Sequence, residues 1–308
     1  MAGLRGRALV AYLIVCVVWG STYLAIRVAV THLPPFLMAG VRFLIAGAVL
    51  AAVVRMTGVK FPTNLRAWLV NSVVGTLLLA GGNGGVVWAE QFTASGTTSI
   101  IVVTVAVWTA FFDAVTPGGT TTLTWRVGGG LVAALAGTFV LTGLTPDEIF
   151  SANLRGLIGL TLASISWAFG TVFSKRNPVG TSPYVASAIQ MLVGGTVLTV
   201  VGLTLGEPGR WHWTQEGTIA LGYLIVFGSL VGFTAYAYAL RHMSPTILGT
   251  YAYVNPVVAV LLGWVFLREP ITARTLLGMG IVLGAVVWMQ MSKRQSAKAV
   301  AISVKDTA

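Results

Sequence analysis

Two tryptophans stand near the middle of long apolar stretches of the chain, where a ligand could meet them. Trp19 lies about midway along 9–30, and Trp167 about midway along 157–175. Membrane tryptophans are typical of the interfacial belt, a position that midspan residues do not fit. An indole offers a flat apolar wall and one N–H donor, which suits an apolar amino-acid side chain. We therefore expect both to line a substrate cavity, plain packing being the alternative, with Trp108 as a third candidate.

Amide side chains inside apolar stretches are costly unless they meet a partner or a wet cavity. Asn83 stands in the run AGGNGGVVW, whose glycines weaken a helix or allow close packing. A locally opened helix there would expose backbone dipoles to a carboxylate or an ammonium group. Asn255 precedes Pro256, and a proline kinks a helix by removing a backbone hydrogen bond. We expect Asn83, Asn255 and neighbouring Tyr253 to contact substrate and Pro256 to shape the helix, a merely architectural kink being the alternative.

Two arginines, Arg27 and Arg42, lie inside predicted apolar spans. Arg42 stands about two helical turns from the start of 35–54, where a lone guanidinium demands a carboxylate, carbonyl groups or water. Glu90 ends a later apolar stretch at a matching depth, and Arg27 competes for it. We expect a structural Arg42–Glu90 pair, and direct binding of a substrate carboxylate by Arg42 is the alternative.

Residue types that are missing narrow the chemistry. The histidines fall in predicted loops, and the single cysteine excludes an intramolecular disulfide and a cysteine-based metal cluster. We therefore expect no catalytic residues, no metal and no cofactor. The chain has no Gly-x-x-x-x-Gly-Lys-[Ser/Thr] motif for ATP. Since no acid lies at midplane, we expect gradient-driven transport without tight proton coupling.

The elements that position these residues are membrane-spanning helices. Hydrophobic residues make up 56% of the 308 and charged residues 9%, against roughly a quarter charged in ordinary globular proteins. Bilayer lipid must therefore be the main solvent, which excludes a soluble enzyme. A crossing needs about 20 apolar residues. The sequence predicts an all-α integral membrane protein with ten transmembrane helices at 9–30, 35–54, 67–88, 93–113, 124–144, 157–175, 183–205, 218–240, 246–267 and 275–291.

The basic residues orient these helices. The chain has 19 Lys and Arg against 8 Asp and Glu, a net charge of +11. If the N-terminus is inside, thirteen of the basic residues fall on the inner side and four on the outer side, so both the N and C termini are predicted to be cytoplasmic. These residues are spread through short loops and a tail, not gathered into a face, so nucleic acid is not an expected partner.

The two halves of the sequence resemble each other. Residues 12–50 align with 160–198 at an offset of 148, which sets Trp19 on Trp167. Five spans in each half make an odd number, so the second half enters the membrane inverted, a recurring plan of secondary transporters. We expect a first repeat, a second inverted repeat and a cytoplasmic tail at 1–145, 155–292 and 293–308. The small-residue pairs Gly228-x-x-x-Gly232 and Gly280-x-x-x-Gly284 are assigned to helix packing.

Several segments carry a resemblance to a known family. The sequence resembles the EamA-domain exporters of the drug/metabolite transporter superfamily, above all the YddG/YedA group of bacterial inner-membrane exporters. The resemblance implies a ten-helix inverted-repeat fold, a central cavity, multi-pass residence in the inner (plasma) membrane and export of amino acids or related metabolites. It rests on WGSTYLAIR (19–27), PPFLMAGVRFLIAG (34–47), SISWAFGTVFSKR (164–176) and SPTILGTYAYVNPVVAVLLGWVFLREPIT (244–272).

These observations together predict a transporter that works by alternating access. Its expected partners are the lipid bilayer and a small-molecule substrate, and we expect a monomer. Neutral amino acids, aromatic ones included, are the expected substrates, because the candidate cavity residues are aromatic rings and amides. Efflux of unrelated hydrophobic compounds or drugs is the main alternative, and a membrane enzyme or sensor is the alternative outside transport.

Overall fold

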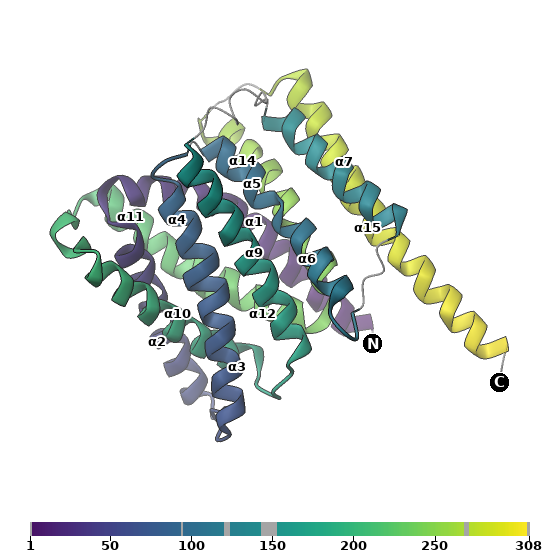
Figure 1. Ribbon diagram of the computed structural model, residues 1–308, viewed down its shortest axis with the longest axis horizontal. Helices are drawn as coiled ribbons and strands as arrows, with labels where there is room; N and C mark the ends of the chain where they lie inside the picture. The colour runs from purple at the N-terminus through teal and green to yellow at the C-terminus, as the bar shows by residue number, and fades with distance from the viewer. Residues whose placement is uncertain (1, 94, 120–123, 143–152, 268–270, 307–308) are drawn as a thin grey trace.

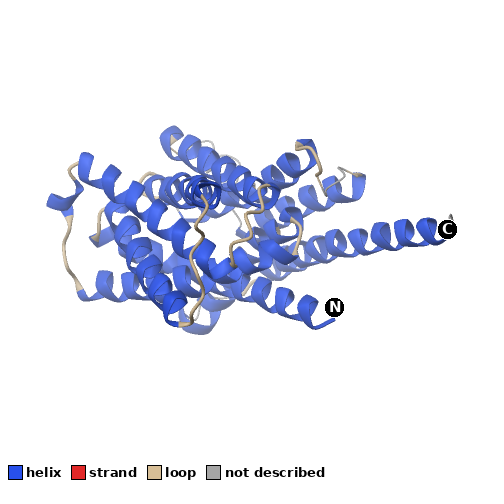
Figure 2. Ribbon diagram, turned by 90° about the horizontal axis from the view of Figure 1, so that it is seen from below, coloured by secondary structure: helices blue, strands red, loops and turns tan. Residues whose placement is uncertain are grey.

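The computed structural model describes residues 2–93, 95–119, 124–142, 153–267 and 271–306. Within them all regular secondary structure is helical (Figure 2), and the helices pack side by side as one bundle (Figure 1). The protein is therefore an all-α integral membrane protein, as its composition predicts.

Among the described residues, the first half of the chain supplies five helical segments, two of which are interrupted. The third segment passes from α-helix into a π-helix and back, and the fourth breaks at Thr104. In chain order the elements are α1 (Ala2–His32), α2 (Pro35–Met56), α3 (Leu65–Gly75), the π-helix η1 (Thr76–Gly84), α4 (Gly85–Ala89), α5 (Ser95–Val103), α6 (Val105–Val115) and α7 (Trp125–Thr142).

The second half repeats this order. Its third segment also contains a π-helix, and its fourth breaks at Thr250. The elements are α9 (Leu154–Arg176), α10 (Pro183–Thr204), the short 3-10 helix η2 (Glu207–Arg210), α11 (Gln215–Tyr223), the π-helix η3 (Leu224–Val231), α12 (Gly232–His242), α13 (Pro245–Gly249), α14 (Tyr251–Leu267) and α15 (Ala273–Asp306).

Seven helical segments in the described part of the chain are long and apolar enough to cross a membrane, by length and composition. Three shorter apolar helices, Ile100–Val115, Trp125–Leu141 and Ala273–Met289, occupy the positions of the fourth, fifth and tenth predicted spans. The count of ten crossings and the cytoplasmic placement of both termini remain predictions.

Features of the two halves recur at the spacing of the sequence repeat. The π-helix η1 begins at Thr76 and η3 begins at Leu224, 148 residues later. Pro35 and Pro183, also 148 apart, each open a helix, where the missing N–H of proline costs nothing. These correspondences agree with a duplicated unit, whose boundaries and inversion remain predictions.

Helix α2 packs against α10 through glycines. A Cβ built on Gly195 would lie 2.9 Å from the backbone nitrogen of Leu44 and 3.0 Å from the carbonyl oxygen of Gly40. Only a residue without a side chain allows backbones to approach this closely. The distance between α2 and α10 therefore depends on one glycine from each half of the chain, Gly40 and Gly195.

Helices α7 and α15 run side by side along one edge of the bundle (Figure 1). Their close approach is made by Gly137 and Gly278, since a Cβ on Gly278 would lie 2.4 Å from the backbone nitrogen of Leu141. The predicted packing role of Gly280 and Gly284 is wrong, because nothing lies within 4 Å of a Cβ built on either residue. Both belong to the other side of the helix.

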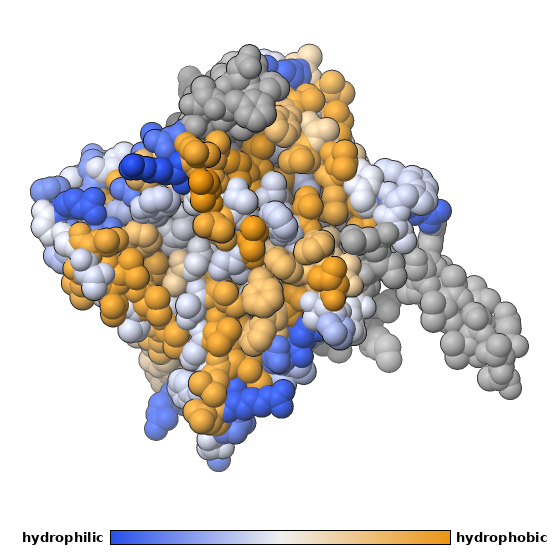
Figure 3. Space-filling model, in the orientation of Figure 1, coloured by the Kyte–Doolittle hydropathy of each residue, from blue (hydrophilic) through white to orange (hydrophobic). Residues whose placement is uncertain are grey.

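The face of the bundle drawn in Figure 3 is largely apolar over its middle, and hydrophilic residues gather toward its ends. Large apolar side chains such as Leu24, Leu162 and Ile219 are about 60% exposed. Patches of this extent on a soluble protein would drive association, whereas acyl chains solvate them.

Candidate functional site

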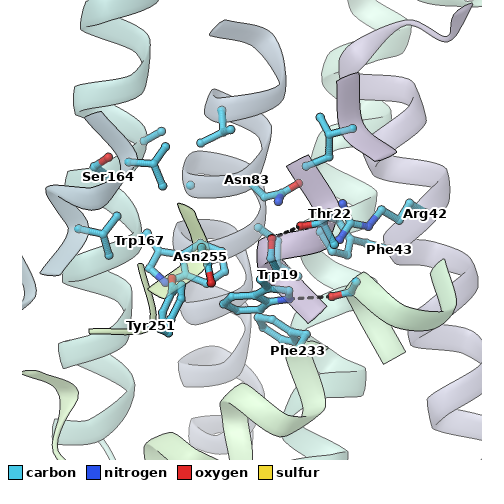
Figure 4. A pocket seen from close by; sticks show the side chains of 18 residues that line it. Trp19, Thr22, Arg42, Phe43, Asn83, Ser164, Trp167, Phe233, Tyr251 and Asn255 are labelled. Atoms are coloured by element: carbon cyan, nitrogen blue, oxygen red, sulfur yellow. Dashed lines mark hydrogen bonds between the residues drawn. The ribbon is translucent and has the colours of Figure 1, made fainter. Parts of the chain in front are cut away.

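A cavity lies at the centre of the bundle, where both halves of the chain meet (Figure 4). Its empty volume is about 700 Å³ when the open space at its mouth is included. Helices α1, α2, α9, α12 and α14 and both π-helices contribute to its wall. The lining includes Trp19, Thr22, Arg42, Phe43, Asn83, Ser164, Trp167, Phe233, Tyr251 and Asn255.

The two midspan tryptophans meet at this cavity. Their ring centroids are 5.3 Å apart with the planes at 83°, the edge-to-face arrangement that aromatic quadrupoles prefer. The indole Nε1 of Trp19 donates a hydrogen bond of 3.0 Å to the carbonyl of Gly228. A Cβ on Gly82 would lie 2.7 Å from Trp167 Cε3, so a glycine of η1 makes room for the second indole.

Four rings close one end of the cavity and form what we call the aromatic wall: Trp19, Trp167, Tyr236 and Tyr251. The Tyr236 ring lies 5.2 Å from Trp19, 5.6 Å from Trp167 and 5.9 Å from Tyr251, between centroids. Its hydroxyl bonds with the Thr171 hydroxyl, which fixes the ring. Tyr236 is buried, whereas Tyr238, two positions further along α12, is only partly buried.

A second cavity lies on the other side of Tyr236, toward the end of the bundle that carries the segments 57–64 and 177–182. Its lining is mixed and includes polar groups: Gln190 Nε2 donates to Asn71 Oδ1 at 2.9 Å, and the Lys175 ammonium donates to the Leu240 carbonyl at 2.6 Å. Trp19, Trp167 and Tyr251 line the central cavity and Tyr236 lines the second one, so the aromatic wall lies between the two.

The two predicted amides both reach the central cavity, with different surroundings. Asn255 is 2% exposed, and in the amide orientation that its neighbours require its nitrogen donates to the carbonyls of Tyr251 at 3.0 Å and Cys16 at 3.2 Å. It therefore ties α14 to α1, just before Pro256 within α14. Asn83 lies on the π-helix η1, and its buried Oδ1 has no hydrogen-bond partner among the described residues.

The structure does not bring two predicted site residues to the cavity. Tyr253 is fully buried between α14 and α7, and its hydroxyl donates to the Leu131 carbonyl at 3.2 Å. The reason is helical periodicity: position 253 is turned about 200° from position 251, so Tyr251 faces the cavity in its place. Trp108 packs against Phe111 and Phe112, each 6.3 Å away between ring centroids, and does not line the cavity.

The predicted Arg42–Glu90 pair is not formed. Arg42 turns into the central cavity and its Nε donates to the Ser229 hydroxyl at 2.8 Å. Both carboxylate oxygens of Glu90 are buried without a hydrogen-bond partner in the described chain. Arg27 Nη1 contacts only the backbone carbonyl of Glu90, at 3.3 Å, among the described bonds. The sequence predicted that the two residues lie at the same depth, but their side chains do not pair.

Sequence reasoning missed several cavity residues that small or common side chains supply. Thr22 follows Trp19 by one turn and donates to its carbonyl at 2.8 Å, and Ser164 precedes Trp167 by one turn. The helical i, i+3 spacing from each tryptophan identifies both positions once the tryptophans are placed in the cavity.

The lining favours noncovalent binding of a small solute with an apolar part. Among the described lining residues, Arg42 is the one with a charged side chain, and the others are aromatic, aliphatic, amide, hydroxyl or glycine. Among the described residues, no group of three or more His, Cys, Asp and Glu comes together where a metal ion could be held.

A bundle of apolar membrane-crossing helices around a central cavity defines a polytopic membrane transporter in class. The EamA-like transporter family matches residues 6–143 and 154–291, nearly the whole chain. The chain belongs to this family. The two matched ranges coincide with the two halves that the sequence repeat marks.

Similar proteins of Escherichia coli and Bacillus subtilis are described as transporters. The chain is 41% identical over 280 residues to YedA of Escherichia coli (strain K12), described as an uncharacterized inner membrane transporter, with 90% of this chain and 88% of YedA covered. It is 24% identical to the transporter YvbV of Bacillus subtilis (strain 168), with 98% and 97% covered. A protein of known crystal structure superposes on this chain with a TM-score of 0.75 at 21% identity. The superposition covers 93% of this chain and 98% of the other one, which supports the fold.

Proposed function

We propose that this protein resides in the inner membrane and exports neutral amino acids, aromatic ones included, from the cytoplasm. The observation that carries the proposal is the meeting of Trp19 and Trp167 edge to face at the central cavity. Two indoles offer a flat apolar enclosure for a side chain of similar character. The printed description of YedA as an inner membrane transporter supports the location.

The route follows from the two cavities. The substrate enters the second cavity from the side predicted to be cytoplasmic, passes the aromatic wall and reaches the central cavity. Movement of one half of the chain against the other then opens the opposite side, as in other inverted-repeat transporters. Asn83 Oδ1, a buried acceptor without a partner in the described chain, supplies a bond to the substrate ammonium group.

The charges of the bundle support export without tight proton coupling. Neither described acid nearest the membrane interior lines the central cavity: Asp113 pairs with Arg176, and Glu90 ends α4. A proton relay in a membrane normally places an ionisable group on the substrate path.

The test is counterflow in proteoliposomes that contain the purified protein. We expect unlabelled internal leucine or phenylalanine to drive uptake of the labelled amino acid, and empty liposomes to show none. Because the wall is mostly aromatic and aliphatic, export of unrelated hydrophobic compounds is the competing function. Competition distinguishes the two functions. If cationic dyes blocked uptake of the labelled compound and no neutral amino acid affected it, amino-acid export would be contradicted.

A further inference from the structure

The Arg42 guanidinium has only part of its hydrogen-bond donors paired at the central cavity. Arg42 is 3% exposed. Its Nε donates to Ser229, while its buried Nη1 has no hydrogen-bond partner in the described chain. Figure 4 shows the side chain entering from α2 on the side of the cavity toward which the Asn83 amide extends. One donor of a buried cation is therefore available to a bound molecule.

The surroundings hold this guanidinium in one place. Its Cζ lies 4.8 Å from the centroid of the Phe43 ring, a cation–π contact. A Cβ on Gly228 would lie 2.7 Å from Nη2, so η3 leaves space for the group only because this residue is glycine. The Gly228 carbonyl, an obvious acceptor, is already bonded by Trp19 Nε1.

Among the residues that the structure describes, no carboxylate forms an ion pair with Arg42. The ion pairs of the described residues join Arg176 to Asp113 and Arg210 to Glu207, and none includes Arg42. An isolated charge inside a membrane protein is expensive and is found paired or facing a wet cavity. A buried, oriented guanidinium without a counter-ion matches the fork geometry of a carboxylate.

We propose that Arg42 binds the carboxylate of the transported substrate, with Ser229 as the residue that positions the guanidinium. The inference rests on the proposed function and narrows it. The substrate class becomes small solutes with one carboxylate and an apolar body, and amines or amides of the same shape are poor substrates. The carboxylate lies at Arg42, the ammonium group of an amino acid faces Asn83, and the apolar side chain meets the indoles.

Binding to the wild-type protein provides the first test. Thermal unfolding of the purified full chain in detergent is measured with 3-phenylpropionate, with its neutral amide, and with chloride alone. We expect 3-phenylpropionate to bind about tenfold or more tightly than the amide, because charge-assisted hydrogen bonds are the stronger ones. Equal affinity for acid and amide, or stabilisation by chloride equal to that by the acid, would overturn the proposal.

Variants locate the preference. Arg42→Gln is expected to reduce the acid-to-amide ratio to about threefold or less, whereas Arg27→Gln, which removes a cation exposed on α1, leaves it unchanged. Ser229→Ala keeps the charge and weakens acid binding only. If Arg42→Gln does not fold, the wild-type ratio and the Ser229→Ala result decide. A preserved preference in Arg42→Gln contradicts the assignment.

The same probes distinguish this inference from the proposed function. If no amino acid shows counterflow but the acid preference depends on Arg42, amino-acid export falls and the carboxylate site stands. If amino acids show counterflow and their amides are carried equally well, the proposed function stands and the carboxylate site falls.

Discussion

Trp167 both lines the central cavity and forms part of the aromatic wall. Its ring faces Trp19 at the cavity and Tyr236 in the aromatic wall, and it is 9% exposed. On the proposed route, the substrate meets Trp167 both when bound and when crossing the aromatic wall. Removal of this ring takes away apolar contact area that no neighbour replaces.

The first prediction concerns this residue. Trp167→Ala is expected to reduce amino-acid counterflow by about tenfold or more, since each 1.4 kcal/mol or so of lost contact is a factor of ten. The measurement is the initial counterflow rate per amount of folded protein in the liposomes. Trp108→Ala is the matched control, because Trp108 packs against phenylalanines outside the cavity. Unchanged transport by Trp167→Ala would remove this ring from the binding site.

At the residue scale, the sequence predicts well how deep a residue lies in the membrane, but it predicts poorly which way the side chain points. Midspan position was enough to place both tryptophans at the cavity. Tyr253 and Arg42 show the limit: Tyr253 turns to α7, and Arg42 bonds Ser229 on a helix 187 residues away in sequence. Partners on distant helices depend on how the helices rotate against each other, which a single sequence does not contain.

At the scale of elements, glycines set the distances between helices. The α2–α10 contact has backbone against backbone at Gly40 and Gly195, and a Cβ on Gly195 would lie 2.9 Å from a backbone nitrogen. A flexible side chain could move away from an added methyl group, whereas a backbone atom moves only with its helix.

The second prediction follows from that contact. Gly195→Ala is expected to cost roughly 1–3 kcal/mol of overpacking, a decrease of several degrees in the unfolding temperature. Gly284→Ala is the control, because open space surrounds a Cβ there and alanine favours a helix over glycine. Thermal unfolding in detergent gives both values. An equal effect of the two substitutions would show that the α2–α10 distance does not limit stability.

Helix positions follow from the sequence, but their interruptions follow only partly. The glycine run around Asn83 predicted a weakened helix, and the structure has a π-helix there. The matching π-helix at Leu224–Val231 lies in a segment rich in aliphatic residues and has no comparable composition. It lies where Trp19 packs against Gly228 and Gly232, a contact between distant segments that composition does not reveal.

At the scale of the whole molecule, the bundle has two different ends. Segments 57–64 and 177–182 lie with the second cavity at one end, and residues 205–214 lie at the other. The distribution of Lys and Arg predicts that the first end is cytoplasmic. Export then requires passage from the second cavity to the central one.

The third prediction tests this orientation by cysteine labelling. The natural Cys16 is buried, so it gives little background. A membrane-impermeant maleimide is expected to label Thr204→Cys in intact cells and to label Lys60→Cys only after the membrane is permeabilised, since both positions are exposed at opposite ends. The reverse pattern would place the N-terminus outside and turn the proposed exporter into an importer.

The fourth prediction concerns the energy source. Because no described acid lines the central cavity, initial counterflow rates are expected to change less than about twofold when a pH gradient of either direction is imposed, since coupling needs an ionisable group on the path. A protonophore is the control for the gradient itself. Accumulation of substrate driven only by the pH gradient would contradict export without tight proton coupling.

The aromatic wall has a consequence for the cell that does not depend on which substrate is carried. An inner membrane stores energy as a voltage and an ion gradient, and any continuous aqueous path through it would dissipate both. In the described chain, packed rings of Trp19, Trp167, Tyr236 and Tyr251 stand between the two cavities. We therefore expect these four side chains to be part of the electrical insulation of the membrane, and a substitution that shrinks one of them to increase ion leakage.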